Sequence, residues 1–273
     1  MGAVQQWVHM QNTEDGEYIF MLVNLHSITV AQDPELLRSY NYHLAAWFLA
    51  AGLNPKKTTM FVQSQNPDHP YLAWMFDCIT PMGWMERMTQ YKDKSKKQGE
   101  RTSVGLFHYP SLMAADILLY NTTLVPVGED QTQHIEITRD IAEKFNNLYG
   151  EVFALPKIRL VNEGARVMSL QNPTEKMSKS SVDPMGTLNV LDTADEIQKK
   201  VMRAVTDSGT EVRAAGDKPA LKNLLALYSA FSGKDVPTIE AEYVGKGYGD
   251  FKKGLAEVVI ASLEPIQKNI MNS

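Results

Sequence analysis

The chain has 273 residues, of which 44% are hydrophobic and 22% are charged, and its formal net charge is −5. These values are ordinary for a globular protein with a sizeable core, and they exclude a global basic field that would attract nucleic acid. The single cysteine, Cys78, excludes an internal disulfide framework, and no apolar run approaches the length of a membrane-spanning helix. We expect a cytoplasmic protein without membrane contact, in which Cys78 is a buried, inert thiol among Trp74 and Phe76.

The first half of the chain alternates between helical and strand patterns. Residues 4–11 have helical spacing, whereas residues 18–25 form a continuous apolar run that is typical of a strand buried on both faces of a parallel sheet. Asp33 and Pro34 suit the N-cap and first position of a helix that ends at Gly52. In chain order, the next predicted elements are a strand at 58–64, helix from 71 to 79, a basic loop at 92–101, an apolar helix at 111–120 and a strand at 124–127.

A long amphipathic helix follows at 130–149, and its predicted buried side chains are Ile135, Ile137, Ile141, Phe145 and Leu148. This alternation of strands and helices predicts the α/β class, with a Rossmann-type, doubly wound parallel sheet. The later part of the chain shows only helical patterns, at 193–205, 219–231, 236–244 and 248–270. We therefore predict an α/β domain over residues 1–183 and a small all-helical domain over residues 184–273.

Two lysines lie three residues apart in the pentapeptide Lys176-Met177-Ser178-Lys179-Ser180, which is followed by a stretch of loop-forming residues. Two ammonium groups on a hydroxyl-rich loop suit a polyphosphate, because a closing loop can strengthen such contacts as charge moves in the transition state. A solvated basic loop is the alternative for an arbitrary pair of lysines at this spacing. For a further lysine, Lys94 in the basic loop, we favour that solvated interpretation over a contact with pyrophosphate.

A glycine turn, Gly128-Glu129-Asp130-Gln131, follows a predicted strand and precedes a helix. Ligands of open α/β sheets bind beyond the carboxyl ends of strands, where a glycine permits close approach and an acid can accept hydrogen bonds from a ribose. Plain capping of the helix explains the acids equally well. His134, on the first turn after these residues, is expected on the helix surface.

Asp116 is a lone carboxylate in a segment that is otherwise apolar from residue 112 to residue 119. A buried carboxylate needs a hydrogen-bond donor, because its unpaired burial costs several kcal/mol, on the order of a lost charge-assisted hydrogen bond or more. An internal arginine or backbone donor is one solution, and a ligand that donates one N–H is the other.

Several of these motifs together resemble the bacterial type of tryptophanyl-tRNA synthetase. The lysine pentapeptide is similar to the second signature of class I aminoacyl-tRNA synthetases, and residues 109–120, 127–134 and 164–170 precede it in the family's order. The resemblance extends from Gly2 to Gln267. It implies ATP-dependent activation of L-tryptophan, transfer to tRNA(Trp), a homodimer, a catalytic domain over residues 1–183 and a helical domain on the anticodon side of the tRNA.

The resemblance also implies roles for single residues. ATP would contact Gly128, Glu129, Asp130, Val167 and the lysine pentapeptide, in which Lys176, Lys179 and Ser180 would be catalytic. Asp116 would accept the indole N–H of tryptophan, Tyr109 and Gln131 would hold its α-amino group, and the apolar walls would be Met113, Val125 and Val127. Mg2+ would arrive with ATP, and we assign no metal ligand because the histidines and the cysteine lack zinc spacing.

The first signature of class I synthetases, a His-x-Gly-His or Thr-x-Gly-Asn motif, does not occur in this sequence. Relatives carry it in a strand and turn that precede the position of Gly2, and they continue further at the C-terminus. We therefore expect an N-truncated form with weak or no activity of its own. The alternatives are an impaired paralogue that binds tryptophan, nucleotide or a partner and, less favoured, another adenylate-forming enzyme. Residues 71–88, rich in Trp and Met, are the expected dimer surface.

Overall fold

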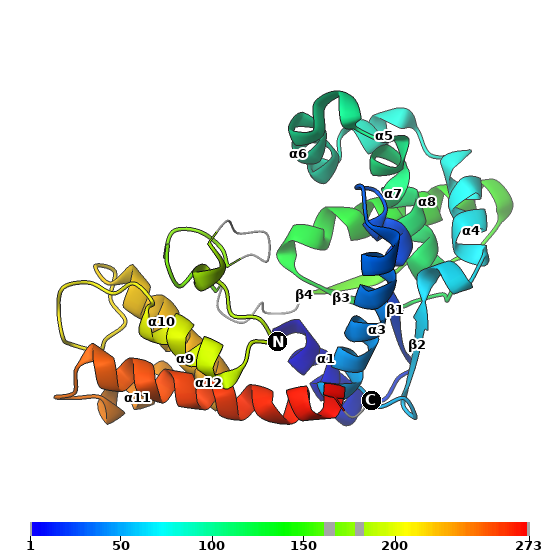
Figure 1. Cartoon of the computed structure of the whole chain (residues 1–273). Helices are drawn as coiled ribbons and strands as arrows, with labels where there is room; N and C mark the ends of the chain where they lie inside the picture. The colour runs from blue at the N-terminus through cyan, green and yellow to red at the C-terminus, as the bar shows by residue number, and fades with distance from the viewer. Residues whose placement is uncertain (1, 161–166, 178–182, 272–273) are drawn as a thin grey trace. The chain divides into compact units, whose positions relative to one another are not determined.

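The structure, a computed structural model, describes residues 2–160, 167–177 and 183–271 (Figure 1). The contacts between residues divide the chain into two compact units, one of residues 9–45 and 53–162 and one of residues 1–8, 46–52 and 163–273. A domain boundary near residue 183 stays a prediction, because this division joins residues 163–183 to the helices that follow them. The unit of residues 9–45 and 53–162 is the α/β unit, and the other is the helical unit.

Within the described residues, the α/β unit contains four short strands in two parallel pairs. β1 (Tyr18–Leu22) pairs with β2 (Thr58–Val62), with Tyr18 opposite Thr58, and β3 (Leu124–Val127) pairs with β4 (Lys157–Leu160), with Leu124 opposite Lys157. Parallel strands need long crossovers, which here run through α3 (Pro34–Ala50) and α8 (Thr132–Tyr149). The parallel pairs confirm the predicted α/β class, and the strands are divided between two sheets.

Helices supply the apolar core of the α/β unit. They are α4 (Asp68–Asp77), α5 (Met82–Glu86), α6 (Thr89–Gln98), α7 (Val104–Leu118) and α8. Phe76 is fully buried among them, and its ring meets those of Phe145 and Phe153 edge-on, with centroids 6.1 and 5.5 Å away. Ser103 caps α7 by accepting a hydrogen bond from the backbone N–H of Leu106. This core holds α7 and α8 in place, and α7 carries most of the site described below.

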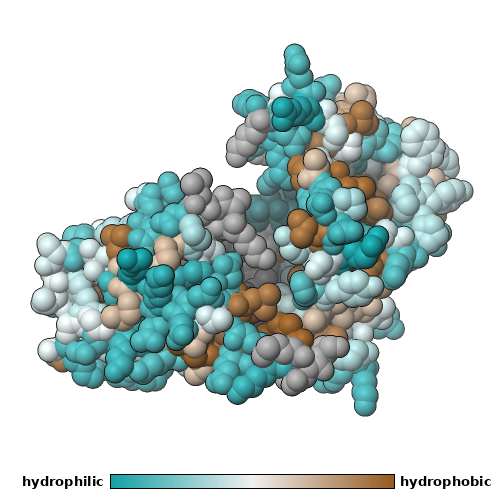
Figure 2. Space-filling model, in the orientation of Figure 1, coloured by the Kyte–Doolittle hydropathy of each residue, from teal (hydrophilic) through white to brown (hydrophobic). Residues whose placement is uncertain are grey.

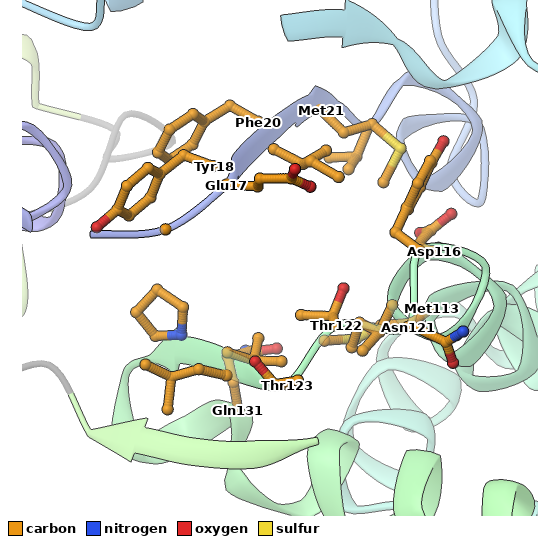
Figure 3. A pocket seen from close by; sticks show the side chains of 18 of the residues that line it. Glu17, Tyr18, Phe20, Met21, Met113, Asp116, Asn121, Thr122, Thr123 and Gln131 are labelled. Carbon is orange, nitrogen blue, oxygen red and sulfur yellow. The ribbon is translucent and has the colours of Figure 1, made fainter. Parts of the chain in front are cut away.

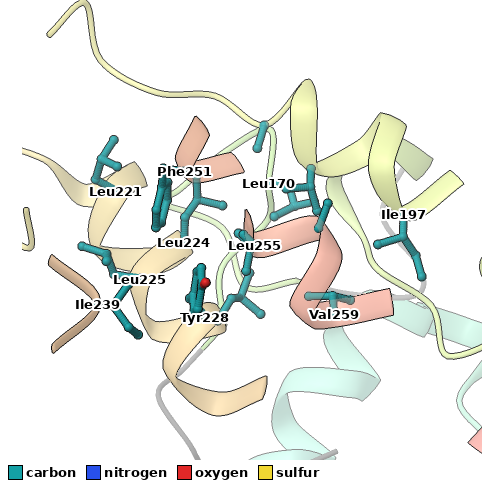
Figure 4. Close-up of a cluster of buried hydrophobic side chains, with 14 of the residues drawn as sticks. Leu170, Ile197, Leu221, Leu224, Leu225, Tyr228, Ile239, Phe251, Leu255 and Val259 are labelled. Carbon is teal, nitrogen blue, oxygen red and sulfur yellow. The ribbon is translucent and has the colours of Figure 1, made fainter. Parts of the chain in front are cut away.

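The helical unit closes around α9 (Ala194–Met202), α10 (Pro219–Ser232), α11 (Val236–Glu242) and α12 (Tyr248–Met271), which confirms the predicted change to helices (Figure 1). Their apolar faces meet in one cluster, in which Leu225, Ile239, Phe251 and Leu255 are completely buried (Figure 4). The Phe251 ring stacks on that of Tyr228, with centroids 5.9 Å apart. Burial of such side chains stabilises a fold by about 1.5–3 kcal/mol each, so this cluster is the main source of the unit's stability.

Three further predictions about local structure are confirmed. α1 (Gly2–Thr13) covers the helical pattern at residues 4–11, and α3 begins and ends near its predicted limits. Asp33 caps α3, because its Oδ1 accepts hydrogen bonds from the backbone N–H groups of Glu35 and Leu36, both at 2.9 Å. Gly52 follows α3 with a φ of 111°, a left-handed conformation that favours glycine.

The predicted basic loop at residues 92–101 is wrong, because most of it is helix. Residues 89–98 form α6, whose lysine and glutamine side chains are compatible with a helix and solvent. The helix ends where Gly99 adopts a φ of 55°. The glycine therefore marks a helix end rather than a loop centre, and the short 3-10 helix η2 (Gly99–Arg101) follows it.

Three predictions about burial are also wrong. Leu148 is 55% exposed, because it lies near the solvent-facing end of α8, whereas the four other side chains predicted to be buried on this helix are buried. Cys78, just beyond the end of α4, is exposed rather than buried. The strand at 18–25 ends at Leu22, since Asn24 begins the short helix α2 (Asn24–Ser27), and Leu22 is the only buried residue among those described in β1.

Candidate functional site

A cavity of about 820 Å3 lies in the α/β unit, between β1, β3 and α7 (Figure 3). Five of the six residues predicted to hold tryptophan line it. Tyr109, Met113 and Asp116 come from α7, Val125 comes from β3, and Gln131 ends the 3-10 helix η3 (Glu129–Gln131). The sixth, Val127, is not among the lining residues. Because α7 is packed firmly into the core, its side chains face the cavity from a rigid wall.

Asp116 is held by a network of hydrogen bonds inside this wall. Its carboxylate lies 2.7 Å from His26 Nε2 and 2.7 Å from His69 Nδ1, and both of its oxygens accept from Gln63 Nε2 at 2.9 Å. The Asp116 side chain is 6% exposed, and that of His69 is fully buried. These contacts show that its partners are two histidines and an amide, and not the arginine or backbone group that the sequence suggested.

The network fixes the proton positions around Asp116. An ionised carboxylate only accepts hydrogen bonds, so the two imidazole nitrogens that face it carry hydrogens. His69 then offers its other nitrogen, Nε2, to the hydroxyl of Tyr120 at 2.8 Å, and that hydroxyl also receives Asn66 Nδ2 at 3.1 Å. The carboxylate is therefore held at the cavity in one orientation as an acceptor, which is the chemistry needed to read a single N–H donor.

A second group of polar side chains lies around Tyr109. Its hydroxyl is 2.6 Å from Nε2 of His134, and Lys94 Nζ lies 5.8 Å from the centre of its ring. Burial raises the pKa of Tyr109 to about 12, and it lowers the pKa of His134, with the charge of Lys94 as the next cause. Both groups are therefore neutral near pH 7, and Tyr109 is a hydrogen-bonding group rather than a base.

His134 differs from its predicted setting, whereas Lys94 is exposed, as predicted. His134 is 3% exposed and not on the helix surface, because the first turn of α8 packs beneath Tyr109. Lys94 extends from α6 to line the cavity and places a positive charge there. The lysine is thus available to an anionic group in the cavity, although its own side chain stays largely exposed.

The residues predicted to contact ATP at the glycine turn lie at the end of β3. Gly128 has a φ of −69°, which any residue can adopt. The backbone conformation therefore does not require glycine, and the predicted close approach of a ligand is the remaining reason for one. Glu129 and Asp130 are exposed, and Asp130 accepts a hydrogen bond from Gln131 Nε2 at 2.9 Å. None of these three residues lines the cavity, and their contact with ATP stays a prediction.

The remaining predicted ATP contacts belong to the helical unit. The backbone N–H of Met177 donates to the carbonyl of Val167 at 3.0 Å, and an antiparallel bridge joins Lys176 to Met168. Asn223 of α10 fastens this pair of segments, since its side chain exchanges two hydrogen bonds with the backbone of Met168. Lys176, the first residue of the lysine pentapeptide, is exposed. Ser178, Lys179 and Ser180 lie outside the described residues, so their predicted roles stay predictions.

Sequence reasoning missed the partners of Asp116. His26, Gln63 and His69 come from three separate elements and approach Asp116 only when β1, β2 and α4 pack together. The sequence contained one signal, because a buried carboxylate on an apolar helix requires hydrogen-bond donors from other elements. Among the described residues no group of three or more His, Cys, Asp or Glu side chains is arranged to hold a metal ion, and no helix is long and apolar enough to cross a membrane.

Comparisons with known proteins agree on one family. A family model described as tRNA synthetases class I (W and Y) matches residues 1–264. The tryptophan–tRNA ligase of Caldanaerobacter subterraneus subsp. tengcongensis is 53% identical over 270 residues, which are 98% of this chain and 82% of that protein. The ligase of Wolinella succinogenes is 52% identical over 268 residues, with 98% and 81% covered.

Solved structures show the same similarity. The tryptophanyl-tRNA synthetase of Campylobacter jejuni in complex with ADP and tryptophan matches with a TM-score of 0.84 and 37% identity, over 99% of this chain and 83% of that one. The tryptophanyl-tRNA synthetase of Mycoplasma pneumoniae matches with a TM-score of 0.83 and 33% identity, over 98% and 82%.

Proposed function

The chain belongs to the tRNA synthetases class I (W and Y), and we propose that within this family it is a tryptophan–tRNA ligase. The observation that carries the choice of amino acid is the fixed carboxylate of Asp116 at the wall of the cavity. Relatives more than half identical over nearly the whole chain are tryptophan–tRNA ligases, which supports a ligase over a protein that only binds tryptophan or a nucleotide.

Indole offers one N–H donor and no acceptor, so one oriented carboxylate is sufficient to recognise it. In our proposal the carboxylate of Asp116 accepts the indole N–H, with Met113 and Val125 as apolar contacts. Tyr109 and Gln131 hold the α-amino group. A phenylalanine in the same place would leave Asp116 without that donor, and such a loss discriminates strongly between side chains.

The reaction that we propose has two steps. A carboxylate oxygen of tryptophan attacks the α-phosphorus of ATP, and the bond to pyrophosphate breaks to leave tryptophanyl-adenylate. A hydroxyl of the terminal ribose of tRNA then attacks the tryptophanyl carbonyl, and AMP leaves. No protein nucleophile is needed, so the protein contributes positioning and charge stabilisation.

Positive charge for the phosphates would come from the lysine pentapeptide, and Mg2+ would be held mainly by ATP itself. If Lys179 acts as the bond to pyrophosphate breaks, Lys179→Ala lowers the adenylation rate far more than it weakens tryptophan binding. Lys222→Ala on α10, which removes an exposed lysine of the same unit, is the control. Equal losses of rate and affinity in Lys179→Ala would show that the lysine has a general folding role instead.

The decisive experiment compares Asp116→Asn with the unaltered chain. The substitution keeps the shape but can present an N–H2 group to the indole N–H, so tryptophan binding weakens by about 2–3 kcal/mol, or roughly 30- to 150-fold. Isothermal calorimetry with tryptophan and tryptophan-dependent exchange between ATP and pyrophosphate measure this. Asp77→Asn is the control, since Asp77 pairs with His108 Nδ1 at 3.0 Å and does not line the cavity. Unchanged affinity in Asp116→Asn removes this residue from the site.

We also propose that the chain by itself exchanges pyrophosphate slowly. The cavity is open between β1 and β3, and a catalytic pocket needs water-excluding walls and fixed donors around the phosphates. Each charge-assisted hydrogen bond to the phosphates is worth about 1.5–3 kcal/mol, so a pocket that makes fewer of them reacts roughly ten- to a hundredfold more slowly per bond. Near-normal exchange by the chain alone would contradict this proposal.

A homodimer is the third part of the proposal. Apolar side chains reach the surface of the α/β unit (Figure 2), and residues 71–88 contribute Tyr71, Trp74 and Met82, which are 69%, 66% and 64% exposed. Exposed aromatic and methionine side chains of this kind are typical of self-association surfaces. We expect light scattering at a protein concentration of about tens of micromolar to give the mass of a dimer. The Trp74→Glu variant is expected to have the mass of a monomer. A monomeric mass for the unaltered chain overturns the proposal.

A further inference from the structure

Two short segments of the helical unit carry predicted contacts to ATP, and they pair with each other. Val167 lies in the first segment, and Lys176 and Met177 lie in the second. The backbone N–H of Met177 donates to the carbonyl of Val167 at 3.0 Å, and that of Ser169 donates to the carbonyl of Glu175 at 2.8 Å. A pair of extended segments without further neighbours is only marginally stable, so its outer edges need partners.

These hydrogen bonds turn the backbone of Met168 away from the second segment. Met168 lies opposite Lys176 in an antiparallel bridge, and both hydrogen bonds of that bridge join the residues on either side of this pair. Opposite residues of an antiparallel pair alternate between exchanging two hydrogen bonds and exchanging none. Met168 and Lys176 are a pair of the second kind, so the N–H and carbonyl groups of Met168 point to the outer edge of the first segment.

Asn223 of α10 satisfies both of these outward groups with one side chain. Its Oδ1 accepts from the N–H of Met168 at 2.8 Å, and its Nδ2 donates to the carbonyl of Met168 at 2.9 Å. Two residues further on, backbone groups have the same role, because the carbonyl of Gly186 accepts from Leu170 at 2.9 Å and the N–H of Val205 donates to Leu170 at 2.8 Å. A carboxamide carries a donor and an acceptor, so Asn223 replaces a neighbouring strand at Met168.

The core of the helical unit fixes the Asn223 side chain in this position. Asn223 is 6% exposed, and Leu221 and Leu224, which lie near it on α10, are almost completely buried (Figure 4). A buried amide that loses its hydrogen bonds is costly, because water cannot replace its partners. The side chain therefore holds Met168 from a rigid helix rather than from a solvated surface.

We propose that Asn223 is a positioning residue for ATP, an inference that rests on the proposed function. Met168 is adjacent to Val167 and lies opposite Lys176, the first residue of the lysine pentapeptide. The two hydrogen bonds of Asn223 thus fix the places of both predicted contacts. A displacement of about 1 Å in a positioning group can slow a reaction about a hundredfold. The predicted tryptophan contacts belong to the α/β unit, so loss of Asn223 affects ATP and not tryptophan.

The test compares three substitutions in the full chain. Asn223→Leu keeps a similar volume and removes both the donor and the acceptor. Asn223→Ser is milder, because a hydroxyl leaves room for a water that bridges to Met168, and it replaces Asn223→Leu in the comparison if circular dichroism shows that the leucine variant does not fold. Ile239→Ala on α11 is the control. Ile239 is completely buried in the same apolar cluster, and Figure 4 shows it away from Leu170, so its loss destabilises the unit without removing the Asn223 hydrogen bonds.

Steady-state kinetics are the first readout. Tryptophan-dependent exchange between ATP and pyrophosphate gives kcat and KM for ATP, and calorimetry gives the tryptophan affinity. We expect Asn223→Leu to lower kcat/KM for ATP by about 30- to 100-fold and Asn223→Ser by about 3- to 10-fold, with tryptophan affinity unchanged within about twofold. We expect Ile239→Ala to keep kcat/KM for ATP within about threefold of the unaltered chain. Equal losses in Asn223→Leu and Ile239→Ala overturn the inference in favour of a general folding role, and so do unchanged constants for ATP in the Asn223 variants.

A second readout does not need catalysis and separates this inference from the proposed function. Hydrogen exchange followed by mass spectrometry is measured with and without ATP and Mg2+. In the unaltered chain we expect ATP to slow the exchange of amides in residues 167–177 by about fivefold or more, and we expect Asn223→Leu to abolish this protection. This pattern in a chain that exchanges no pyrophosphate contradicts the proposed ligase and supports the positioning role. If ATP does not protect residues 167–177 of the unaltered chain, the inference is wrong, whatever the affinity for tryptophan.

Discussion

The helical unit and the α/β unit bury their apolar residues to different extents. In the helical unit four helices close around Phe251, Leu225 and Leu255, and the cluster leaves these side chains without exposure. In the α/β unit the helices pack well, but the strands leave residues such as Ile19 and Leu124 more than a third exposed. Amphipathic helices can complete a core with their own neighbours, whereas a sheet is complete only when each inner strand has two partners.

The contrast separates stability from function in this chain. The helical unit closes an apolar cluster and pairs buried charges internally, as Lys200 does with Asp192, whereas the α/β unit surrounds its cavity with a polar network centred on Asp116. An open, polar and partly exposed region is where a ligand can contribute binding energy. The following predictions test this contrast, and they begin with the largest expected effect.

Removing the Phe251 ring gives the largest loss of stability. Phe251→Ala leaves a cavity in a closed core between Tyr228 and Tyr243, so we expect a loss of about 3–5 kcal/mol in the free energy of unfolding of the helical unit. Ile19→Ala on β1 is the matched change in the α/β unit and costs less than about 1 kcal/mol, because Ile19 is already 40% exposed. Urea unfolding followed by hydrogen exchange measures both. Similar losses from the two substitutions would contradict the contrast.

Breaking the polar network costs less. His69→Leu removes the donor to Asp116 Oδ1 and the partner of the Tyr120 hydroxyl, so we expect a loss of about 1–3 kcal/mol, confined to the α/β unit. The same change weakens tryptophan binding, because the carboxylate loses its fixed orientation. His9→Leu, in α1 and exposed, is the control. A loss of stability with unchanged tryptophan affinity would show that the network holds only the fold.

Helix caps should cost the same in both units, because a cap is local. Thr193 and Glu196 form a capping box at the start of α9, and Asp33 caps α3. We expect Thr193→Ala and Asp33→Ala each to cost about 1 kcal/mol. Thermal unfolding followed by circular dichroism measures the effect, with Thr193→Ser and Asp33→Asn as conservative controls. A much larger loss at one cap would mean that the unit around it is only marginally folded.

The smallest effect concerns acid stability of the helical unit. The hydroxyl of Tyr248 donates to Asp207 at 2.7 Å and is the largest cause of a pKa lowered from 3.8 to about 2. A lowered carboxyl pKa stabilises the folded state above pH 3.8, and this stability is lost as the pH falls towards 2. Tyr248→Phe therefore removes part of this stability at pH 7, and the stability of the variant falls less as the pH decreases from 3.8 towards 2. Circular dichroism between pH 2 and 7, about the range of carboxyl titration, measures it, and Tyr149→Phe at an exposed position is the control.

Local patterns predicted much of the fold. The helix from Pro34 to Ala50, the strand at 124–127 and the change to helices late in the chain follow from capping residues, apolar runs and helical spacing, which act over a few residues. The prediction was wrong for residues 92–101, where a charged segment was interpreted as a loop and most of it is helix. Residues 89–98 contain no glycine or proline, and lysine is compatible with a helix, so composition alone did not identify a break.

The lining of the cavity was predicted in part. The motifs named Tyr109, Met113, Asp116, Val125 and Gln131, and the structure brings these five together in one cavity. The partners of Asp116 and the burial of His134 could not be predicted, because they depend on contacts between elements that are far apart in the chain. His26 and Asp116, for example, are 90 residues apart.

The sequence by itself determined the class of the chain, the order of its elements and the motifs that place it among the class I synthetases. These depend on residue types at short spacing, where the physics of caps, turns and amphipathic faces is local. The tertiary structure decided which donors hold Asp116 and which side chains line the cavity. Pairing and burial depend on the neighbours that a strand or a carboxylate meets in space, and spacing along the chain does not specify those neighbours.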